Sequence, residues 1–250
     1  MDKFYTEKKL PIVSPGVAAE AKHVEIEQIK KLPPGYTRPE QININTKRPS
    51  PLETRFNRIV KRSFDVLLAA LFIVFILSWL IPLLAIFIKL DSKGPVFFLQ
   101  KRSGLGGKTF TCIKFRSMFM NEEADLLAEQ ENDARITRLG KFLRKWHIDE
   151  LPQLFNVLMG DMSLVGRRPY MIQENNIFEN LFSGYAYRYK VKPGITGYAQ
   201  SRGNYGNTRD LKKLKQRVDL DFLYIQKWSP AMDVKILFHT CRMIAGKSQD

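Results

Sequence analysis

An uncharged, strongly apolar stretch covers residues 66–88 and constrains the fold more than any other feature of the sequence. At about 1.5 Å per residue, a helix of these 23 residues is long enough to cross the roughly 30 Å hydrocarbon core of a bilayer. A helix of a soluble domain normally keeps a polar face, and this stretch has none. The stretch therefore predicts a helix inserted into a membrane.

The residues within and around this stretch leave two topologies open. Pro82 removes one helical hydrogen bond and clashes with the carbonyl of Ser78, whose hydroxyl can form a local hydrogen bond at the break. Basic side chains flank the stretch on both sides: Arg55, Arg58, Lys61 and Arg62 precede it, and Lys89, Lys93, Lys101 and Arg102 follow it. The positive-inside rule places both flanks in the cytoplasm, which a re-entrant helix bent at Pro82 satisfies. A single-pass helix with a proline kink is the more common structure, and both alternatives stay open.

The chain divides into three parts by composition. Residues 1–54 contain seven of the 13 prolines and few periodic apolar residues, so we expect an extended or disordered arm. The first ten residues lack an apolar core, which predicts no signal peptide. Residues 55–91 form the membrane-inserted helix. Residues 92–250 are long enough for one domain with its own hydrophobic core.

The 250-residue chain has a formal net charge of +15, and residues 92–250 hold 26 basic and 16 acidic side chains. A basic domain beside a membrane predicts anionic lipid headgroups or phosphorylated substrates as partners. Nucleic acid is the rival partner, but the sequence contains no recognition-helix or RNA-binding motif, so we expect none. The two cysteines, Cys112 and Cys241, predict no disulfide framework.

Patterning in residues 92–250 predicts an α+β fold that is mostly helical. Two β-rich runs, residues 95–102 and 108–115, flank a glycine-rich turn and predict a β-hairpin. Helices are expected over residues 121–132, 138–147 and 208–228, and from Pro230 onward. The last helix has an apolar stripe bordered by basic residues, which suits either the core or a membrane interface.

Two acidic residues, Asp149 and Glu150, precede Pro152, which is suited to the first turn of a helix. A helix N-terminus stabilises carboxylates and attracts anions. N-capping of this helix by Asp149 would account for the pair without a catalytic role, and the residues alone favour this interpretation.

Basic side chains that could contact a phosphate lie in three segments. They are Lys114 and Arg116 at the end of the hairpin, Arg144 on the helix expected over residues 138–147, and Arg168 in the loop at residues 160–169. The forked guanidinium of arginine binds phosphate through two hydrogen bonds. A solvated charged surface is the ordinary alternative.

Seven short segments of the sequence form a recognisable series of motifs. They are Arg62-Ser63-Phe64-Asp65, the apolar stretch with Pro82, Gly94-Pro95-Val96-Phe97-Phe98, Lys114-Phe115-Arg116-Ser117-Met118, Asp149-Glu150-Leu151-Pro152-Gln153, Gly160-Asp161-Met162-Ser163-Leu164-Val165-Gly166 and Lys192-Pro193-Gly194-Ile195-Thr196-Gly197. In this order they resemble the bacterial sugar transferases, the monotopic phosphoglycosyl transferases of glycoconjugate assembly. The resemblance covers about residues 58–245.

The resemblance implies transfer of a sugar-1-phosphate from a nucleotide diphosphate sugar, with UDP expected as the nucleotide, to polyprenyl (undecaprenyl) phosphate. This is the first membrane step in assembly of an exopolysaccharide, capsule, lipopolysaccharide or glycoprotein glycan. It implies that Asp149 is a nucleophile that forms an aspartyl-phosphosugar intermediate, that Glu150 is its proton or metal partner, and that both bind Mg²⁺. Among the phosphate-binding candidates, Arg144 and Arg168 rank before Lys114 and Arg116.

The resemblance also implies a location. The family's membrane element is a re-entrant helix broken near proline, here at Ser78 and Pro82, and the site faces the cytoplasm at the bacterial inner membrane. Partners would be the polyprenyl phosphate, the nucleotide sugar and, as a further option, a second copy of the chain.

Two loops depart from the family pattern. Arg167-Arg168-Pro169 replaces the usual Pro-Arg-Pro, and Arg168 aligns with the family arginine. Gly197-Tyr198-Ala199-Gln200 replaces Gly-Trp-Ala-Gln in a loop that we expect to bear on donor choice, so no sugar is predicted. A non-catalytic membrane scaffold is the remaining alternative function.

Overall fold

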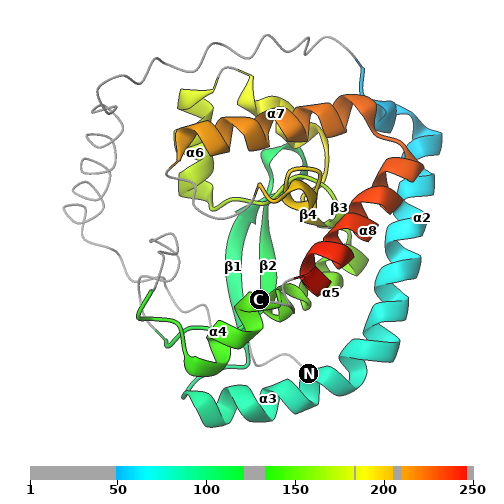
Figure 1. Cartoon of the computed structure of the whole chain (residues 1–250). Coiled ribbons are helices and arrows are strands. Elements are labelled where there is room, and N and C mark those ends of the chain that lie inside the picture. The colour runs from blue at the N-terminus through cyan, green and yellow to red at the C-terminus, as the bar shows by residue number, and fades with distance from the viewer. Residues whose placement is uncertain (1–48, 121–132, 183, 205–209, 247–250) are drawn as a thin grey trace, which may run out of the picture. The chain divides into compact units, whose positions relative to one another are not determined.

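The computed structural model describes residues 49–120, 133–182, 184–204 and 210–246, which all belong to one compact unit (Figure 1). Most of the predicted arm, residues 1–48, lies outside the described residues, and so does the helix predicted over residues 121–132. Residues 49–54 are folded: Leu52 is buried, and the Ser50 hydroxyl donates to the carbonyl of Ile225 (2.7 Å). The folded unit therefore begins before residue 55, earlier than the sequence predicted.

The apolar stretch forms a continuous helical segment that changes direction (Figure 1). Its parts are helix α2 (Arg55–Phe72), a π-helical turn (Ile73–Leu77) and helix α3 (Ser78–Asp91). The Ser78 hydroxyl donates to the carbonyl of Val74 (2.6 Å), while Pro82 has no N–H to donate to the carbonyl of Ser78. Because π-turns and prolines both bend helices, the helix is disrupted in the turn before Ser78 as well as at the predicted break.

Both halves of this segment are bonded to the same folded unit. In α2, Arg62 donates to the carbonyl of Val157 (2.5 Å). At the end of α3, Arg116 donates to the carbonyl of Ile88 (3.1 Å). A straight helix of 37 residues would hold its ends about 55 Å apart. The bend therefore brings both ends to one domain, as the re-entrant alternative requires.

Most of the apolar surface of α2 and α3 is exposed. The exposed large side chains include Leu67, Leu71, Phe72, Val74, Phe75, Trp79, Leu83, Ile86, Phe87 and Leu90. Within the described part of the chain, this is the one helical segment long and apolar enough to cross a membrane, and 17% of its most apolar portion is buried. A core helix of a water-soluble domain would bury this surface, so the exposure agrees with the predicted insertion.

The predicted hairpin is confirmed, and a second small sheet accompanies it. Strand β1 (Phe97–Ser103) pairs antiparallel with β2 (Thr109–Phe115). Strands β3 (Ser163–Val165) and β4 (Gly194–Thr196) form a parallel pair where the sequence predicted only loops. Glycine is required there, because a Cβ atom on Gly194 would lie 2.1 Å from the backbone nitrogen of Gly166.

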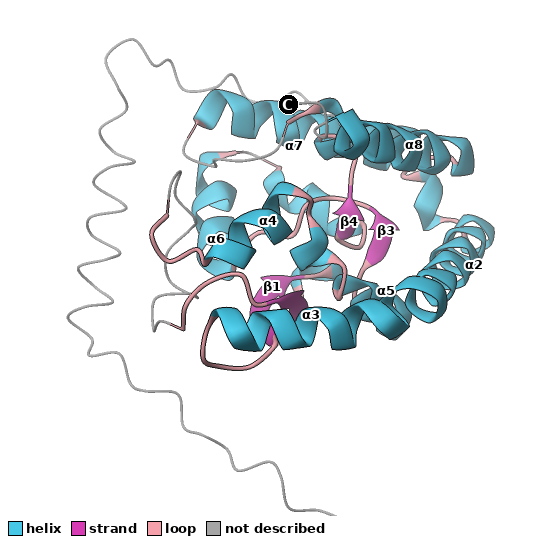
Figure 2. Ribbon diagram, turned by 60° about the horizontal axis from the view of Figure 1, so that its bottom comes forward, coloured by secondary structure: helices cyan, strands magenta, loops and turns pink. Residues whose placement is uncertain are grey.

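The remaining helices complete the α+β fold. They are α4 (Arg138–Lys145), α5 (Gln153–Met159), α6 (Ile172–Leu181), α7 (Leu211–Lys227) and α8 (Pro230–Gly246). Helices α4, α7 and α8 were predicted, and α6 was missed. Helix α7 lies on one side of the unit and α3 on the opposite side, with both sheets between them (Figures 1 and 2). On α8, Ile236 is buried in the core while Phe238 is exposed, so its two faces have different environments.

Asn156 joins α5 to the hairpin. Its side chain is fully buried, its Nδ2 donates to the carbonyl of Thr111 (2.7 Å), and its Oδ1 accepts from the N–H of Ile113 (3.0 Å). The amide therefore bonds to β2 as a neighbouring strand would, and it fixes β2 beside the segment that carries the acidic pair.

We expect Asn156→Leu to lower the free energy of unfolding by about 2–4 kcal/mol, because it removes the side-chain partners of a partly buried carbonyl and a partly buried N–H of β2. Thermal unfolding of the detergent-solubilised protein, followed by circular dichroism, measures this loss. Asn180→Leu is the matched control, since among the described residues the Asn180 amide bonds only to the carbonyl of Asn176 within α6, and it is exposed. An equal loss in both variants would contradict the bridging role of Asn156.

Candidate active site

The acidic pair lies on a short 3₁₀ turn that follows a residue in an unusual conformation. His147 has φ 55° and is the one non-glycine residue with positive φ in the described ranges. Its carbonyl accepts from the N–H of Glu150 (3.3 Å), which closes the turn Ile148–Glu150. Asp149 and Glu150 are both buried. The pair precedes α5 as the sequence predicted, but a separate turn holds it. Backbone conformations of this kind occur often at functional sites.

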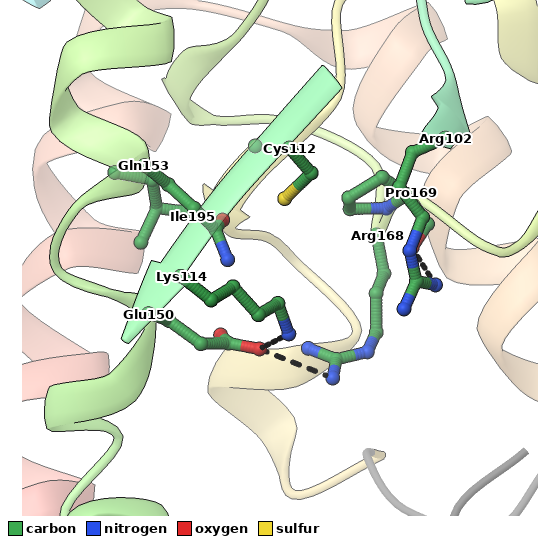
Figure 3. Close-up of a pocket in the computed structure, with 9 residues that line it drawn as sticks. Arg102, Cys112, Lys114, Glu150, Gln153, Arg168, Pro169 and Ile195 are labelled. Carbon is green, nitrogen blue, oxygen red and sulfur yellow. Dashed lines mark hydrogen bonds and ion pairs between the residues drawn. The ribbon is translucent and has the colours of Figure 1, made fainter. Parts of the chain in front are cut away.

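Glu150 binds two cations that come from different elements (Figure 3). Its Oε1 accepts from Nζ of Lys114 on β2 (2.9 Å) and lies 3.5 Å from Nη2 of Arg168 in the loop after β3. These residues are distant in the sequence, so the ion pairs depend on the tertiary fold.

The two cations keep Glu150 ionised. Burial alone would raise the pKa of the Glu150 carboxyl, but the charges of Lys114 and Arg168 outweigh burial and lower that pKa well below its ordinary value. The pKa of Arg168 is raised, mainly by the charge of Glu150 and further by that of Asp149. Both carboxylates therefore act on one guanidinium, and Glu150 is a fixed negative charge near neutral pH.

Because its folded pKa is lowered, ionised Glu150 stabilises the fold fully above the ordinary glutamate pKa of about 4.3. That contribution is lost as the pH falls below this value toward the lowered folded pKa. We therefore expect the difference in Tm between the wild type and Glu150→Gln to be largest near neutral pH and to shrink below about pH 5. Thermal unfolding over that range measures it, and a difference independent of pH would contradict the lowered pKa.

A pocket opens beside Glu150 (Figure 3). It is lined by Arg102, Cys112, Lys114, Glu150, Gln153, Arg168, Pro169, Gly194 and Ile195. Three of these side chains are cations and one is a carboxylate. The excess positive charge suits a phosphate group.

The side chains of the two adjacent arginines in the loop after β3, Arg167 and Arg168, have different partners. Arg167 is fully buried, and its Nη2 donates to the carbonyls of Ser103 (3.0 Å) and Gly104 (2.8 Å) at the hairpin turn. Its guanidinium also lies over the ring of Tyr189, 4.8 Å from the centroid. The side chain of Arg168 is one third exposed and reaches Glu150. Arg168 therefore lies at the pocket, and Arg167 has a structural role.

A buried ion pair supports the Arg168 backbone. Nη2 of Arg188 donates to the carbonyl of Arg168 (3.1 Å) and lies 2.7 Å from a carboxylate oxygen of Asp221. The Arg188 guanidinium lies over the rings of Tyr170 and Tyr185, 4.8 Å from each centroid. This packing holds the loop in one position.

Two of the predicted phosphate-binding residues do not line the pocket. Arg116 is buried, and its Nη2 donates to the carbonyls of Ile88 (3.1 Å) and Ser92 (2.6 Å), where it caps the end of α3. Arg144 on α4 donates through Nε to the hydroxyl of Ser117 (2.7 Å). Of the four candidates, the structure brings Lys114 and Arg168 into the pocket.

Sequence reasoning missed Arg102, Cys112 and Gln153 as pocket residues. The sequence marks Arg102 only as a basic flank of the membrane stretch. Alternation along β1 could have identified it, because Arg102 shares a face with the buried Gln100, whereas Lys101 is exposed. No comparable pattern marks Gln153, whose position depends on how α5 packs.

The residues that the structure describes contain no cluster of three or more carboxylate, histidine or cysteine side chains that could hold a metal ion. Asp149 and Glu150 nevertheless supply carboxylate oxygens, which Mg²⁺ prefers. Mg²⁺ commonly binds one or two carboxylates together with substrate phosphates and water. The pair therefore fits an ion shared with a diphosphate.

Comparison with protein families gives the deciding observation, because the family described as "Bacterial sugar transferase" matches residues 56–247. The chain belongs to this family. The match includes the bent helix, the hairpin, the acidic pair and the segments that contain β3 and β4, so every element of the site lies within the family region.

Individual relatives of this sugar transferase carry names that state a reaction. This chain is 45% identical over 185 residues to "UDP-glucose:undecaprenyl-phosphate glucose-1-phosphate transferase" of Escherichia coli (strain K12). The alignment covers 74% of this chain and 40% of the relative. The protein of the same name from Caulobacter vibrioides is 45% identical over 181 residues, with 72% and 67% covered. "UDP-N-acetylgalactosamine-undecaprenyl-phosphate N-acetylgalactosaminephosphotransferase" of Aeromonas hydrophila is 44% identical over 197 residues, with 78% and 45% covered. The chain thus spans about two fifths of the length of the Escherichia coli relative.

Proposed function

We propose that this sugar transferase moves a sugar-1-phosphate from a UDP-sugar to undecaprenyl phosphate at the cytoplasmic face of a bacterial inner membrane. The observation that carries the proposal is the buried acidic pair, in which Glu150 binds Lys114 and Arg168 and is adjacent to Asp149, on a unit with a bent, exposed apolar helix. Relatives 44% and 45% identical are named for this reaction with different sugars, so their names support the reaction and leave the donor sugar open.

Asp149 is the proposed nucleophile. An oxygen of its carboxylate attacks the phosphorus that bears the sugar, and the bond from that phosphorus to the oxygen of the leaving UMP breaks. An oxygen of the polyprenyl phosphate then attacks the same phosphorus, which releases the Asp149 carboxylate and forms the polyprenyl diphosphate sugar. Burial of Asp149 limits access of water to the aspartyl phosphate.

The cations offset the repulsion between the diphosphate and the two carboxylates. Lys114 and Arg168 can each donate to phosphate oxygens, and Glu150 holds them in position at 2.9 Å and 3.5 Å. When bound, Mg²⁺ would neutralise further phosphate charge, with Asp149 and Glu150 as its protein ligands. Glu150 thus organises charge in the proposed reaction, since its lowered pKa makes it a poor proton donor at neutral pH.

The proposed acceptor determines where the site must lie. A polyprenyl phosphate stays in the bilayer, so its phosphate lies at headgroup depth and the pocket must be held there. A re-entrant helix with both flanks in the cytoplasm would do so, because α2 and α3 are both bonded to the catalytic unit.

We expect single cysteines at Arg58 and Lys93 to react from the same side of intact membranes. Both positions are exposed and flank the apolar stretch on opposite ends. A Cys241→Ser background removes the exposed native thiol, while Cys112 is buried. Labelling with a membrane-impermeant maleimide, in intact spheroplasts and in inverted vesicles, gives the measurement. Labelling of the two positions from opposite sides would show a single-pass helix instead.

The function itself is tested by UMP release from a panel of UDP-sugars, with purified protein in detergent, undecaprenyl phosphate and Mg²⁺. Release that depends on one UDP-sugar would support the proposal and identify the donor. A folded wild-type protein that releases UMP from none of them would favour the scaffold alternative or another nucleotide.

A further inference from the structure

Arg102 is the one cation of the pocket that forms no ion pair with any residue that the structure describes. Its Nε donates to Oε1 of Gln100 (2.9 Å), and its Nη2 bonds to the same oxygen. Its Nη1 donates to the carbonyl of Pro169 (3.1 Å). All of these partners are neutral, so the guanidinium is held in place without a direct ion pair, and the charges of Glu174 and Glu150 reach it only at longer range.

A partly buried cation that has no direct ion pair is unfavourable unless a counter-ion binds it. The other two pocket cations, Lys114 and Arg168, share Glu150. In Figure 3, Arg102 lies on the far side of the pocket from the ion pair between Lys114 and Glu150. That side of the pocket therefore has a positive charge in position to bind an anion.

We propose that Arg102 binds a substrate phosphate, as a third cation of the pocket. The inference rests on the proposed function, whose donor carries two phosphoryl groups. Asp149 attacks one of them beside Lys114 and Arg168, and Arg102 binds the other, which departs with UMP. After UMP leaves, the same guanidinium is available to the phosphate of the lipid acceptor. The bond from Arg102 to the carbonyl of Pro169 ties its guanidinium to the backbone of the loop that carries Arg168.

The test compares Arg102→Gln with Lys101→Gln. Lys101 is the adjacent cation of β1, is exposed on the opposite face and donates only to the hydroxyl of Thr111 (3.0 Å) among the described residues, so it is a matched control for charge. We expect Arg102→Gln to weaken pyrophosphate binding, measured by titration calorimetry, by about tenfold to a hundredfold, as for loss of a charged hydrogen bond. Lys101→Gln should bind as the wild type does. Equal binding by all three proteins would overturn the proposal.

Kinetics distinguish the two sources of phosphate. If Arg102 binds the nucleotide phosphate, Arg102→Gln raises the KM for the UDP-sugar and the inhibition constant of UMP, and leaves the KM for the lipid unchanged. If it binds the lipid phosphate, the reverse pattern is expected. Unchanged values of all three would overturn the proposal.

Two further measurements separate phosphate binding by Arg102 from a purely structural role and from a failure to fold. Arg102→Lys keeps the charge and is expected to recover part of the lost binding, which a purely structural role at Gln100 and Pro169 would not produce. If Arg102→Gln fails to fold, pyrophosphate binding by Arg102→Lys replaces it as the test. Weaker binding than the wild type would support contact of the forked Arg102 guanidinium with phosphate, and binding equal to the wild type would overturn the proposal. Because calorimetry does not require turnover, a failure of the transferase reaction leaves this test intact.

Discussion

Asp149→Asn is expected to lower turnover by about a thousandfold or more and to abolish the covalent intermediate, because the amide cannot serve as the attacking oxygen nucleophile. The same substitution should leave the ion pairs of Glu150 with Lys114 and Arg168 in place. We therefore expect the loss in activity without a large change in Tm. UMP release and retention of radiolabelled sugar phosphate on the acid-quenched protein are the two measurements.

Asp210→Asn provides the control for this result. Asp210 is exposed, is not part of the acidic pair and caps α7 by accepting from the N–H groups of Lys212 (3.0 Å) and Lys213 (3.1 Å). Asparagine caps helices about as well as aspartate, so this variant removes a carboxylate and keeps the fold. Turnover within tenfold of the wild type in Asp149→Asn would exclude Asp149 as the nucleophile and leave the reaction class standing.

Arg168→Gln is expected to lower turnover by about a hundredfold or more while the protein stays folded. The Arg168 side chain is one third exposed and its guanidinium lies 3.5 Å from Glu150, where it can stabilise charge on a transferred phosphoryl group. Its loss removes this stabilisation and one partner of Glu150, but Lys114 still pairs with that carboxylate at 2.9 Å. UMP release and thermal unfolding, measured on the same preparation, separate the two effects.

Arg167→Gln should give the opposite result, a loss of stability of about 2–4 kcal/mol. Arg167 is fully buried, and the substitution removes its hydrogen bonds to the carbonyls of Ser103 and Gly104 and its contact with the Tyr189 ring. If Arg168→Gln destabilises the fold and Arg167→Gln mainly lowers turnover, the assignment of the two neighbours is reversed.

Local patterns were sufficient for several elements of the protein. The uncharged stretch predicted the membrane-type helix, alternating residues around glycines predicted the hairpin, and the apolar spacing on α7 predicted a buried face that includes Leu214, Val218 and Phe222. The acidic pair was identified because its segment resembles a family motif. Each of these features is encoded by residues close together in the chain, so composition and periodicity can reveal it.

Other features depended on contacts between distant segments. The β3–β4 pair joins two short runs that have no strand pattern of their own, and the adjacent Arg167 and Arg168 could not be told apart by spacing. The sequence ranked Arg144 before Lys114 as a phosphate-binding candidate, and only the structure shows that Lys114, but not Arg144, lines the pocket.

The sequence by itself therefore determined the membrane element, the main secondary structure, the family and the acidic pair, because these follow from local patterning and recognisable motifs. Only the tertiary structure decided that the two ends of the bent helix meet one domain, and that Arg102, Lys114 and Arg168 line one pocket. The physical reason is that the direction of a charged side chain is set by the packing and hydrogen bonds of its surroundings. Those surroundings come from elements far away along the chain.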